Sequence, residues 1–351
     1  DAITPSIVDR DPVVVAIGTE GTAPVLARQI KTRMEELLEP GLGDLAALAG
    51  RLRDRAAMRL GPRKRRDLWR WVFNGAPRSA HKQGSERAAA QMIKAAIETG
   101  DFADGPTQTA AVSLVGAGPG SADLITLRGV QRLQEADIIF YDRLVDPAIL
   151  ELARRDAERV FVGKEPGCHA WPQDRINQVL VSAARQGKRV VRLKCGDPGI
   201  FARGAEEAEA LKAAGLSYEI VPGVTAASGA AASMGTFLTE RGTTDTLVLT
   251  TGHKEDGVAV PDWLPQLQSG ARVAVYMGVR SAEAIEGSLR DAGLIDCVDV
   301  TIVAKAQTPD ETVTHGAAAN LSDLIAAERI ASPAIIFLQR RTRAVAAIAA
   351  A

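Results

Sequence analysis

Val112-Ser113-Leu114-Val115-Gly116-Ala117-Gly118-Pro119-Gly120 is the stretch that decides the fold of this chain. A short apolar run ends in three alternate glycines and a proline, which predicts a buried strand that enters a loop. Glycine has no Cβ atom, so such a loop lets the backbone approach a ligand closely. The loop is therefore a candidate binding site, with a tight structural turn as the alternative.

A dinucleotide is the first ligand class to consider for this loop. The dinucleotide fingerprint is G-x-G-x-x-G at the start of a helix, with an acidic residue about 20 positions later. Asp142 ends the apolar run 137–141 and matches the acidic residue, but the glycine spacing here is G-x-G-x-G. A helical pattern resumes only near Thr126, too late for a helix N-terminus to hold a pyrophosphate. An NAD-dependent oxidoreductase stays as an alternative, although NAD is not the expected cofactor.

Composition narrows the class of protein. The 351 residues are 46% apolar and 24% charged, with a net charge of −1. This length predicts two or three domains, and the near-neutral charge gives no support for a nucleic-acid or membrane partner. No apolar run approaches the roughly 20 residues of a membrane span. Cys168, Cys195 and Cys297 lie far apart, so neither a disulfide framework nor a metal site is expected, which favours a reducing cytoplasm.

The first 99 residues predict a mainly helical region. A strand is expected at 13–17, and two helices are expected across 24–60. From Arg51 to Arg87 there are twelve Lys and Arg residues against three acidic ones, beside two tryptophans. We interpret this stretch as a solvated helix face whose tryptophans pack inward or across a dimer interface, rather than as a nucleic-acid site.

Strands and helices alternate from residue 111 onward, after a small, polar segment at 100–110 that predicts an interdomain linker. Strands are expected at 111–115, 137–141, 159–162, 189–193, 218–221, 246–250, 272–276, 300–304 and 334–338. Helices are expected at 126–135, 146–155, 173–186, 204–214, 224–234, 281–292 and 320–328. This alternation predicts an α/β architecture with largely parallel strands, in which ligands bind at the carboxyl ends of the strands.

Seven consecutive strand ends carry Gly, Pro, small or charged residues, which is more than turns require and predicts the lining of one large cleft. They are 116–120, 141–143, 163–164, 194–204, 222–228, 250–253 and 277–278. Each has a simpler alternative: Asp142 could be a helix N-cap, Asp197-Pro198-Gly199 a plain turn, and Lys164 a loop lysine. His253 has no second histidine or cysteine spaced to share a metal with it.

These motifs resemble the uroporphyrinogen-III C-methyltransferases of the tetrapyrrole methylase family. The resemblance covers 112–340 and rests on motifs that occur in order. They are V-G-A-G-P-G at 115–120, Y-D-R-L-V at 141–145, V-G-K at 162–164, G-D-P at 196–198, V-P-G-V-T-A-A-S at 221–228, L-T at 238–239, T-G-H at 251–253 and Y-M-G at 276–278. It implies a two-lobed α/β methylase fold over 111–345, preceded by a partial, mainly helical dimerisation module.

Residues 1–99 resemble the C-terminal part of a precorrin-2 dehydrogenase/ferrochelatase module, through P-S-I-V-D-R at 5–10 and P-V-L-A-R at 24–28. The combination resembles the siroheme synthase family. No G-x-G-x-x-G precedes residue 13, so we expect the NAD-binding segment to be missing, by truncation or because the sequence is incomplete, and the dehydrogenase and ferrochelatase steps to be lost. Residues 24–90 are expected to form a homodimer, and a residual dimerisation scaffold is the non-enzymatic alternative.

The resemblance also implies the chemistry. S-adenosylmethionine would be the methyl donor and S-adenosylhomocysteine its product. Uroporphyrinogen III would be methylated at carbons 2 and 7 to precorrin-2, for siroheme and, as a further option, cobalamin. Asp142 aligns with the family's proposed base and Lys164 with its proposed proton donor. The donor would contact Pro119, Cys195, Gly196, Asp197, Ile200, Thr225, Ala226, Met277 and Ala306.

The acceptor carries eight carboxylates, which call for cationic donors. The candidates near the cleft are Arg143, Arg192 and Arg203, with Lys194 and Arg241 as further options. The stretch C-G-D-P-G-I-F-A-R-G-A at 195–205 departs from the family's G-G-D-P-F-I-F-G-R-G-G, which we interpret as subfamily variation.

Overall fold

The computed structural model describes residues 4–102, 111–163, 171–252 and 263–341. The chain forms two compact units, Asp1–Thr109 (unit 1) and Ala110–Ala351 (unit 2). Three residues that the sequence singles out, Lys164, Cys168 and His253, lie outside the described residues.

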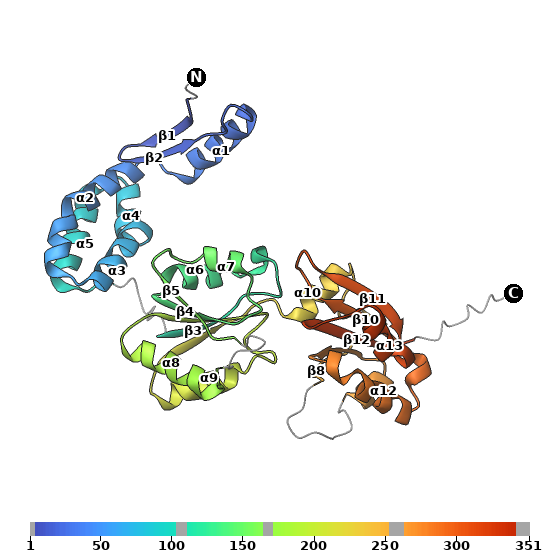
Figure 1. The fold of residues 1–351 in the computed structure, drawn as a ribbon. Coiled ribbons are helices and arrows are strands. Elements are labelled where there is room, and N and C mark those ends of the chain that lie inside the picture. Colours follow the sequence, from blue (N-terminus) through green and yellow to red (C-terminus); the bar gives the residue numbers. More distant parts are fainter. Residues whose placement is uncertain (1–3, 103–110, 164–170, 253–262, 342–351) are drawn as a thin grey trace. The chain divides into compact units, whose positions relative to one another are not determined.

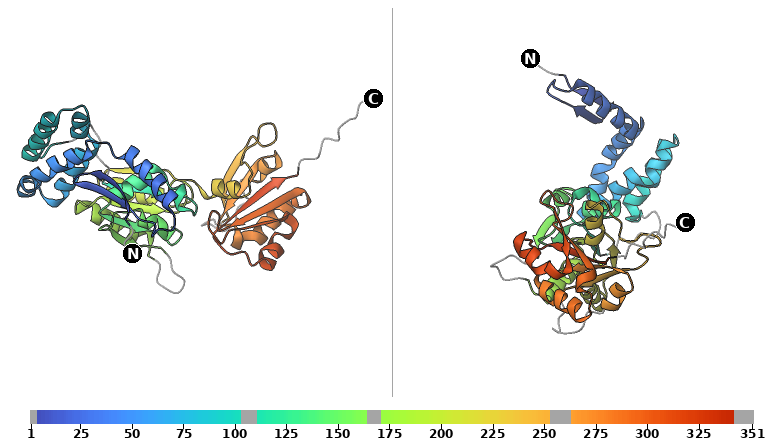
Figure 2. Two further views of the ribbon diagram at one scale, coloured as in Figure 1. Left: turned by 90° about the horizontal axis from the view of Figure 1, so that it is seen from above. Right: turned by 90° about the vertical axis from the view of Figure 1, so that its right-hand side faces the viewer.

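Unit 1 begins with an antiparallel hairpin of Ser6–Arg10 (β1) and Val13–Ile17 (β2), so the strand expected at 13–17 has a partner that we did not predict. Helices follow at Pro24–Leu37 (α1), Leu42–Arg59 (α2), Pro62–Asn74 (α3), Ala76–Lys82 (α4) and Glu86–Thr99 (α5). The hairpin packs with α1, while α2 to α5 form a small helical bundle (Figure 2).

The bundle core explains the two tryptophans of the basic stretch. Leu45, Leu68 and Ile93 are fully buried between α2, α3 and α5, and Trp69 and Trp71 pack against this cluster. On the same helix, Arg63, Lys64 and Arg66 are exposed to solvent, as expected for an amphipathic helix. The interpretation of inward-packed tryptophans on a solvated helix is therefore confirmed.

Unit 2 contains two lobes, each built on a five-stranded sheet. The first sheet is fully parallel, in the order β5-β4-β6-β3-β7. Its strands are Val112–Gly116 (β3), Ile138–Tyr141 (β4), Glu158–Phe161 (β5), Val190–Lys194 (β6) and Tyr218–Val221 (β7). Helices cover both faces (Figure 1), with Leu127–Glu135 (α6) and Pro147–Glu151 (α7) on one, and Gln173–Arg185 (α8) and Gly204–Ala213 (α9) on the other.

The second sheet has the order β11-β10-β12-β9-β8. Its strands are Leu247–Thr251 (β8), Arg272–Tyr276 (β9), Val298–Ala304 (β10), Thr312–Ala317 (β11) and Ala334–Arg340 (β12). Ala226–Ser233 (α10) packs on one face. The other face carries Leu264–Gln268 (α11), Ala282–Asp291 (α12) and Leu321–Ala327 (α13) (Figure 1). Short 3₁₀ helices lie at Ala122–Leu124 (η1), Val279–Ser281 (η2), Ile295–Cys297 (η3) and Ala318–Asn320 (η4).

The nine strands and seven helices expected from residue 111 onward are present, and the expected arrangement of two α/β lobes is confirmed. The prediction of largely parallel strands is wrong for the second lobe, where only β8 and β9 pair in parallel. Residues 305–311 join β10 to β11, and a connection this short allows only an antiparallel pair. Strand β11 was missed because its residues, Thr312-Val313-Thr314-His315-Gly316-Ala317, are those of a polar edge strand and form no apolar run.

Candidate functional site

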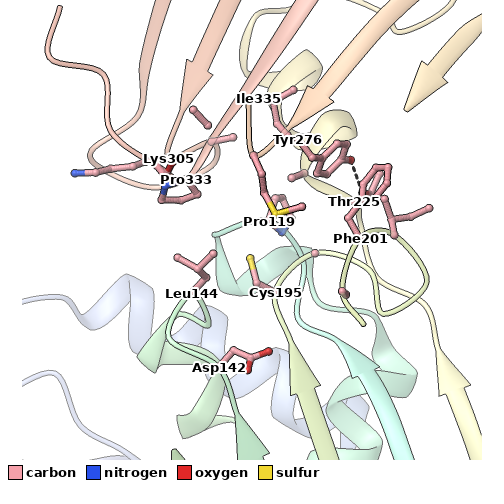
Figure 3. Close-up of a pocket in the computed structure, with 18 of the residues that line it drawn as sticks. Pro119, Asp142, Leu144, Cys195, Phe201, Thr225, Tyr276, Lys305, Pro333 and Ile335 are labelled. Carbon is pink, nitrogen blue, oxygen red and sulfur yellow. Dashed lines mark hydrogen bonds between the residues drawn. The ribbon is translucent and has the colours of Figure 1, made fainter. Parts of the chain in front are cut away.

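A cavity of about 660 Å³ lies within unit 2, where strand ends of the first lobe meet the second lobe. Asp142 lies at its first-lobe end and Ile335 at its second-lobe end, with Cys195 and Pro119 between them (Figure 3). The cavity brings together all nine predicted donor contacts, together with Asp142 and Arg143. The nine are Pro119, Cys195, Gly196, Asp197, Ile200, Thr225, Ala226, Met277 and Ala306.

The first-lobe loops that line this cavity make close backbone contacts with one another. A Cβ atom added to Gly223 would lie 2.3 Å from the carbonyl oxygen of Gly196, and one added to Gly116 would lie 2.6 Å from the same oxygen. Gly118 and Gly196 exchange backbone hydrogen bonds of 3.2 and 2.7 Å. The glycines therefore let the loops after β3, β6 and β7 converge on one point.

Asp197 joins two of these loops. Its Oδ1 accepts a hydrogen bond of 2.7 Å from the Gly199 amide, and its Oδ2 accepts one of 2.9 Å from the Gly223 amide. The first contact is the turn geometry that the sequence left open as an alternative, and the second crosses to the loop after β7. Both carboxylate oxygens of Asp197 thus hold the backbone of the loops that line the cavity.

The second lobe supplies an aromatic wall. The Tyr276 hydroxyl lies 2.7 Å from Thr225 Oγ1 and accepts a hydrogen bond of 3.0 Å from the Ala227 amide (Figure 3). The Phe201 ring packs against Tyr276 at 5.0 Å between ring centroids. Phe201, Met277 and Lys305 line the cavity with φ angles of 48°, 54° and 50°. Non-glycine residues in this strained region concentrate at ligand-binding sites.

Sequence reasoning did not single out Lys305, Pro333 and Ile335 as lining residues. The last two lie at the start of β12, whose residue Ile335 pairs with Tyr276 of β9. Because β12 is antiparallel, its amino end meets the carboxyl ends of β9 and β10 at the cavity. These residues were missed because the sequence analysis expected parallel strands, and a parallel β12 would start at the opposite edge of the sheet.

Asp142 is held through one oxygen. Arg192 Nη2 donates a hydrogen bond of 2.6 Å to Asp142 Oδ1, whereas Oδ2 accepts none from the residues that the structure describes. The nearby helix α7 is capped by Asp146, whose Oδ1 accepts a hydrogen bond of 2.7 Å from the Ala148 amide. The N-cap alternative for Asp142 is therefore wrong.

Arg192 and Lys194 are buried on the same face of β6, and both contact Glu207 Oε1, at 2.9 and 2.8 Å. Burial would lower the pKa of Arg192, but the carboxylates of Glu207 and Asp142 outweigh it and raise that pKa. Burial, and then the charge of Arg192, lower the pKa of Lys194. Arg192 is thus satisfied by two carboxylates and does not line the cavity, which removes it from the acceptor-contacting cations.

The other predicted cations differ in position. Arg143 lines the cavity, is exposed, and makes no ion pair within the described part of the chain. Arg203 lies outside the lining and forms an exposed pair with Glu206, with two contacts of 2.7 Å. Arg241 is exposed and also lies outside the lining. Among the predicted acceptor contacts with a described position, Arg143 alone reaches the cavity wall with its charge unpaired.

The Cys195 thiol is expected to resist alkylation. Burial, reinforced by the negative charge of Asp142, raises its pKa to about 11, so the neutral thiol prevails at lower pH. Iodoacetamide labelling followed by peptide mass spectrometry should give slow modification of Cys195 at pH 8 and a steep rise toward pH 11. The unfolded chain in urea, in which Cys195 should react readily at pH 8, is the control, and rapid labelling of the folded protein at pH 8 would contradict the burial.

The glycine loop of β3 does not open a helix. Gly120 is followed by η1, and α6 begins only at Leu127. A dinucleotide pyrophosphate would therefore find no helix N-terminus at these glycines.

Within the described residues, no cluster of three or more His, Cys, Asp or Glu side chains has metal-binding geometry. No helix among them has the length and apolar character needed to cross a bilayer.

Two family models match this chain. Residues 111–322 match the family described as Tetrapyrrole (Corrin/Porphyrin) Methylases, and residues 41–97 match the Sirohaem synthase dimerisation region. A siroheme synthase of Chromobacterium violaceum is 44% identical over 337 residues, which cover 96% of this chain and 71% of the relative. A siroheme synthase of Sodalis glossinidius is 42% identical, with 96% and 70% covered.

Solved structures agree with the fold. The uroporphyrin-III C-methyltransferase of Thermus thermophilus, in complex with S-adenosyl homocysteine, superposes with a TM-score of 0.54 at 37% identity, covering 65% of this chain and 96% of that one. A cobalt precorrin-4 methyltransferase superposes with a TM-score of 0.58 at 29% identity, covering 65% and 94%. The chain belongs to the siroheme synthase family, and its residues 111–322 form a tetrapyrrole methylase domain.

Proposed function

We propose that unit 2 transfers methyl groups from S-adenosylmethionine to carbons 2 and 7 of uroporphyrinogen III, which gives precorrin-2 for siroheme synthesis. One observation carries the proposal: the converging loops line a largely apolar cavity, and the Oδ2 atom of Asp142 at one end of it accepts no hydrogen bond from the described residues. The family supplies the reaction class, and the relative from Thermus thermophilus binds the demethylated donor.

The donor fits the walls of the cavity. Pro119, Ile200, Val303 and Ala306 form apolar walls, and the volume lies within the range of about 300–1,000 Å³ that small-molecule sites occupy. A sulfonium methyl group is already electrophilic, so the main task of the protein is to align it with an electron-rich ring carbon. When bound, the donor would supply the methyl group and leave as a neutral thioether.

The proton balance assigns a role to Asp142. The ring carbon uses its π electron pair to form the new carbon–carbon bond, the sulfur keeps the pair of the broken bond, and the ring becomes cationic. The ring then loses a proton to restore conjugation. The Asp142 carboxylate would stabilise the cation and accept this proton at Oδ2, because Oδ1 is held by Arg192. Lys164 remains the predicted proton donor, next to Gly163 of the cavity lining.

The carboxylates of the acceptor require cations at the mouth of the cavity. Arg143 extends from the first lobe, and Lys305 lies on the second lobe, 45% exposed and 3.2 Å from Asp310. A guanidinium binds a carboxylate through two parallel hydrogen bonds, which favours the unpaired Arg143. We therefore propose Arg143 as the principal acceptor contact.

Arg143→Gln is expected to raise the KM for uroporphyrinogen III about tenfold, the effect of losing one charge-assisted contact. The affinity for S-adenosylhomocysteine should stay within about twofold, because the donor walls are untouched. Steady-state kinetics and calorimetry measure the two quantities. Arg290→Gln, on the exposed face of α12, is the matched control, and equal KM values for the two variants would remove Arg143 from the acceptor site.

The overall function is tested by incubating the purified chain with methyl-labelled donor and uroporphyrinogen III. The expected result is a product with two labelled methyl groups and two molecules of S-adenosylhomocysteine. Binding of S-adenosylhomocysteine without transfer to this acceptor would show that the acceptor is another tetrapyrrole. Binding of NAD in place of the donor would favour the oxidoreductase alternative.

We further propose that unit 1 mediates a homodimer. The matched dimerisation region at 41–97 supports this assembly. Large apolar side chains are also exposed on unit 1, among them Val25, Leu37 and Met58, and burial of these side chains against a second copy would stabilise the dimer.

We also propose that the protein acts in the cytoplasm. Cys195 and Cys297 form no disulfide bond in the described part of the chain, which is typical of proteins in a reducing compartment.

A further inference from the structure

Four charged side chains form a chain of contacts from the cavity into the first lobe. Arg192 lies in the middle and contacts Asp142 Oδ1 at 2.6 Å and Glu207 Oε1 at 2.9 Å. Lys194 Nζ contacts the same Glu207 oxygen at 2.8 Å. The side chains of Arg192 and Lys194 are 3% exposed and that of Glu207 is 0% exposed, whereas Asp142 is 31% exposed. Both ends of this chain, Asp142 and Lys194, line the cavity, whereas Arg192 and Glu207 between them do not.

We propose that Glu207 is a positioning residue for methyl transfer and that it acts on Asp142 through Arg192. The inference deepens the proposed function and rests on it, because it explains how the proton acceptor keeps one oxygen available. Glu207 itself is fully buried on α9 and is absent from the cavity lining, so it does not contact the reactants.

The geometry of Arg192 carries the first step of the argument. Its Nε donates to Glu207, its Nη1 donates to the Leu193 carbonyl oxygen at 3.2 Å, and its Nη2 donates to Asp142. An arginine free of Glu207 would present two parallel N–H groups to Asp142 and occupy both carboxylate oxygens. By holding Nε, Glu207 restricts Arg192 to a single contact and leaves Asp142 Oδ2 open.

Charge balance carries the second step. The network contains two carboxylates and two cations, so Glu207 offsets positive charge that would otherwise act on Asp142 alone. An uncompensated Arg192 would stabilise the carboxylate form of Asp142 and make it a weaker proton acceptor. The ionisable groups around Asp142 are Arg192, Lys194, Cys195 and the adjacent Arg143, with Lys164 outside the described residues.

An unsatisfied atom argues against a purely stabilising role. Glu207 Oε2 is buried without a hydrogen-bond partner among the described residues, while Oε1 receives both cations. Leaving a buried oxygen unpaired is unfavourable, and apolar side chains of similar volume often replace buried ion pairs without loss of stability. The arrangement is better explained by the position that it gives to Arg192.

Glu207→Gln keeps an oxygen that can accept the hydrogen bond from Arg192 Nε and removes only the negative charge, so it tests the charge balance of the network. We expect the rate of the first methylation, measured in single turnovers, to fall about 10- to 100-fold, within the usual range for proton-transfer catalysis. KM values for donor and acceptor should stay within about threefold, since neither binding wall changes. Glu209→Gln, exposed on the same helix, is the matched control.

A second variant covers the case in which Glu207→Gln does not fold. The double variant Lys194→Met/Glu207→Leu removes one charge of each sign and fills the space with apolar atoms, so we expect it to fold. Lys194→Met alone is its control, because Lys194 also lines the cavity. Its methylation rate should still be low, because Arg192 loses its anchor. A folded double variant with the wild-type rate would overturn the inference, as would a loss explained by donor affinity alone. An inactive wild-type enzyme would instead overturn the proposed function.

Discussion

Asp142→Asn is expected to reduce the rate of methyl transfer by at least about 100-fold, the lower end of the usual contribution of a general base. Asparagine keeps an oxygen that can accept the hydrogen bond from Arg192 Nη2, so the side chain should stay in place. It lacks the negative charge that stabilises the ring cation and cannot accept the proton from it. The chemical step should therefore fail while the cavity keeps its shape.

The measurement combines labelled methyl transfer with calorimetric titration of S-adenosylhomocysteine. Donor affinity should change by less than about threefold, because the donor walls lie on other loops. Asp146→Asn is a close control: it makes the same substitution four residues later, and asparagine caps a helix as well as aspartate does. If both variants methylate at the wild-type rate, another group accepts the proton.

Much of the site was predictable from the sequence because of one geometric rule. In a parallel sheet every strand delivers its following loop to the same edge, so residues as far apart as Pro119, Asp142 and Thr225 converge. Glycines and prolines marked these loops, and the loops do line one cavity. The first-lobe wall therefore follows from the parallel direction of the strands, without knowledge of any side-chain contact.

The second-lobe wall was harder to predict because an apolar run indicates a strand but not the direction of that strand in the sheet. Residues 334–338 predict a strand equally well in either direction, yet only the antiparallel direction brings Pro333 and Ile335 to the cavity. Connection length was the usable signal for β11, since seven residues cannot cross over to a parallel neighbour. To predict that the start of β12 lies at the cavity, one must know which strands it pairs with and in which direction.

The role of Arg192 could not be predicted from charge alone, because an arginine can bind a ligand or a buried carboxylate equally well. One signal was present: Arg192 and Lys194 are two residues apart in the strand Val190–Lys194, so both point to one face of a central strand. Two cations buried side by side require an anion from a neighbouring element. That anion, Glu207, comes from the first turn of α9, and only the packing of this helix on the sheet identifies it.

Gly223→Ala is expected to destabilise unit 2 by about 3 kcal/mol, near the upper end of the usual cost of overpacking. The added methyl group would lie 2.3 Å from the Gly196 carbonyl oxygen and 2.9 Å from Gly116 Cα, and both contacts are with backbone that no rotamer change can move. The loops after β3 and β6 would have to separate. The melting temperature should fall by about 6–12 °C for a unit of this size.

The same separation should also weaken donor binding by more than about tenfold, because Gly196 and Asp197 line the cavity and the Gly223 amide donates to Asp197 Oδ2. Calorimetry with S-adenosylhomocysteine, well below the melting temperature, measures this effect apart from unfolding. Gly287→Ala is the control: this glycine lies within α12 with no atom within 4 Å of an added Cβ, so alanine should be neutral or slightly stabilising there. Wild-type stability in Gly223→Ala would mean that the three loops do not meet at this glycine, and wild-type donor affinity would separate the loop junction from the donor site.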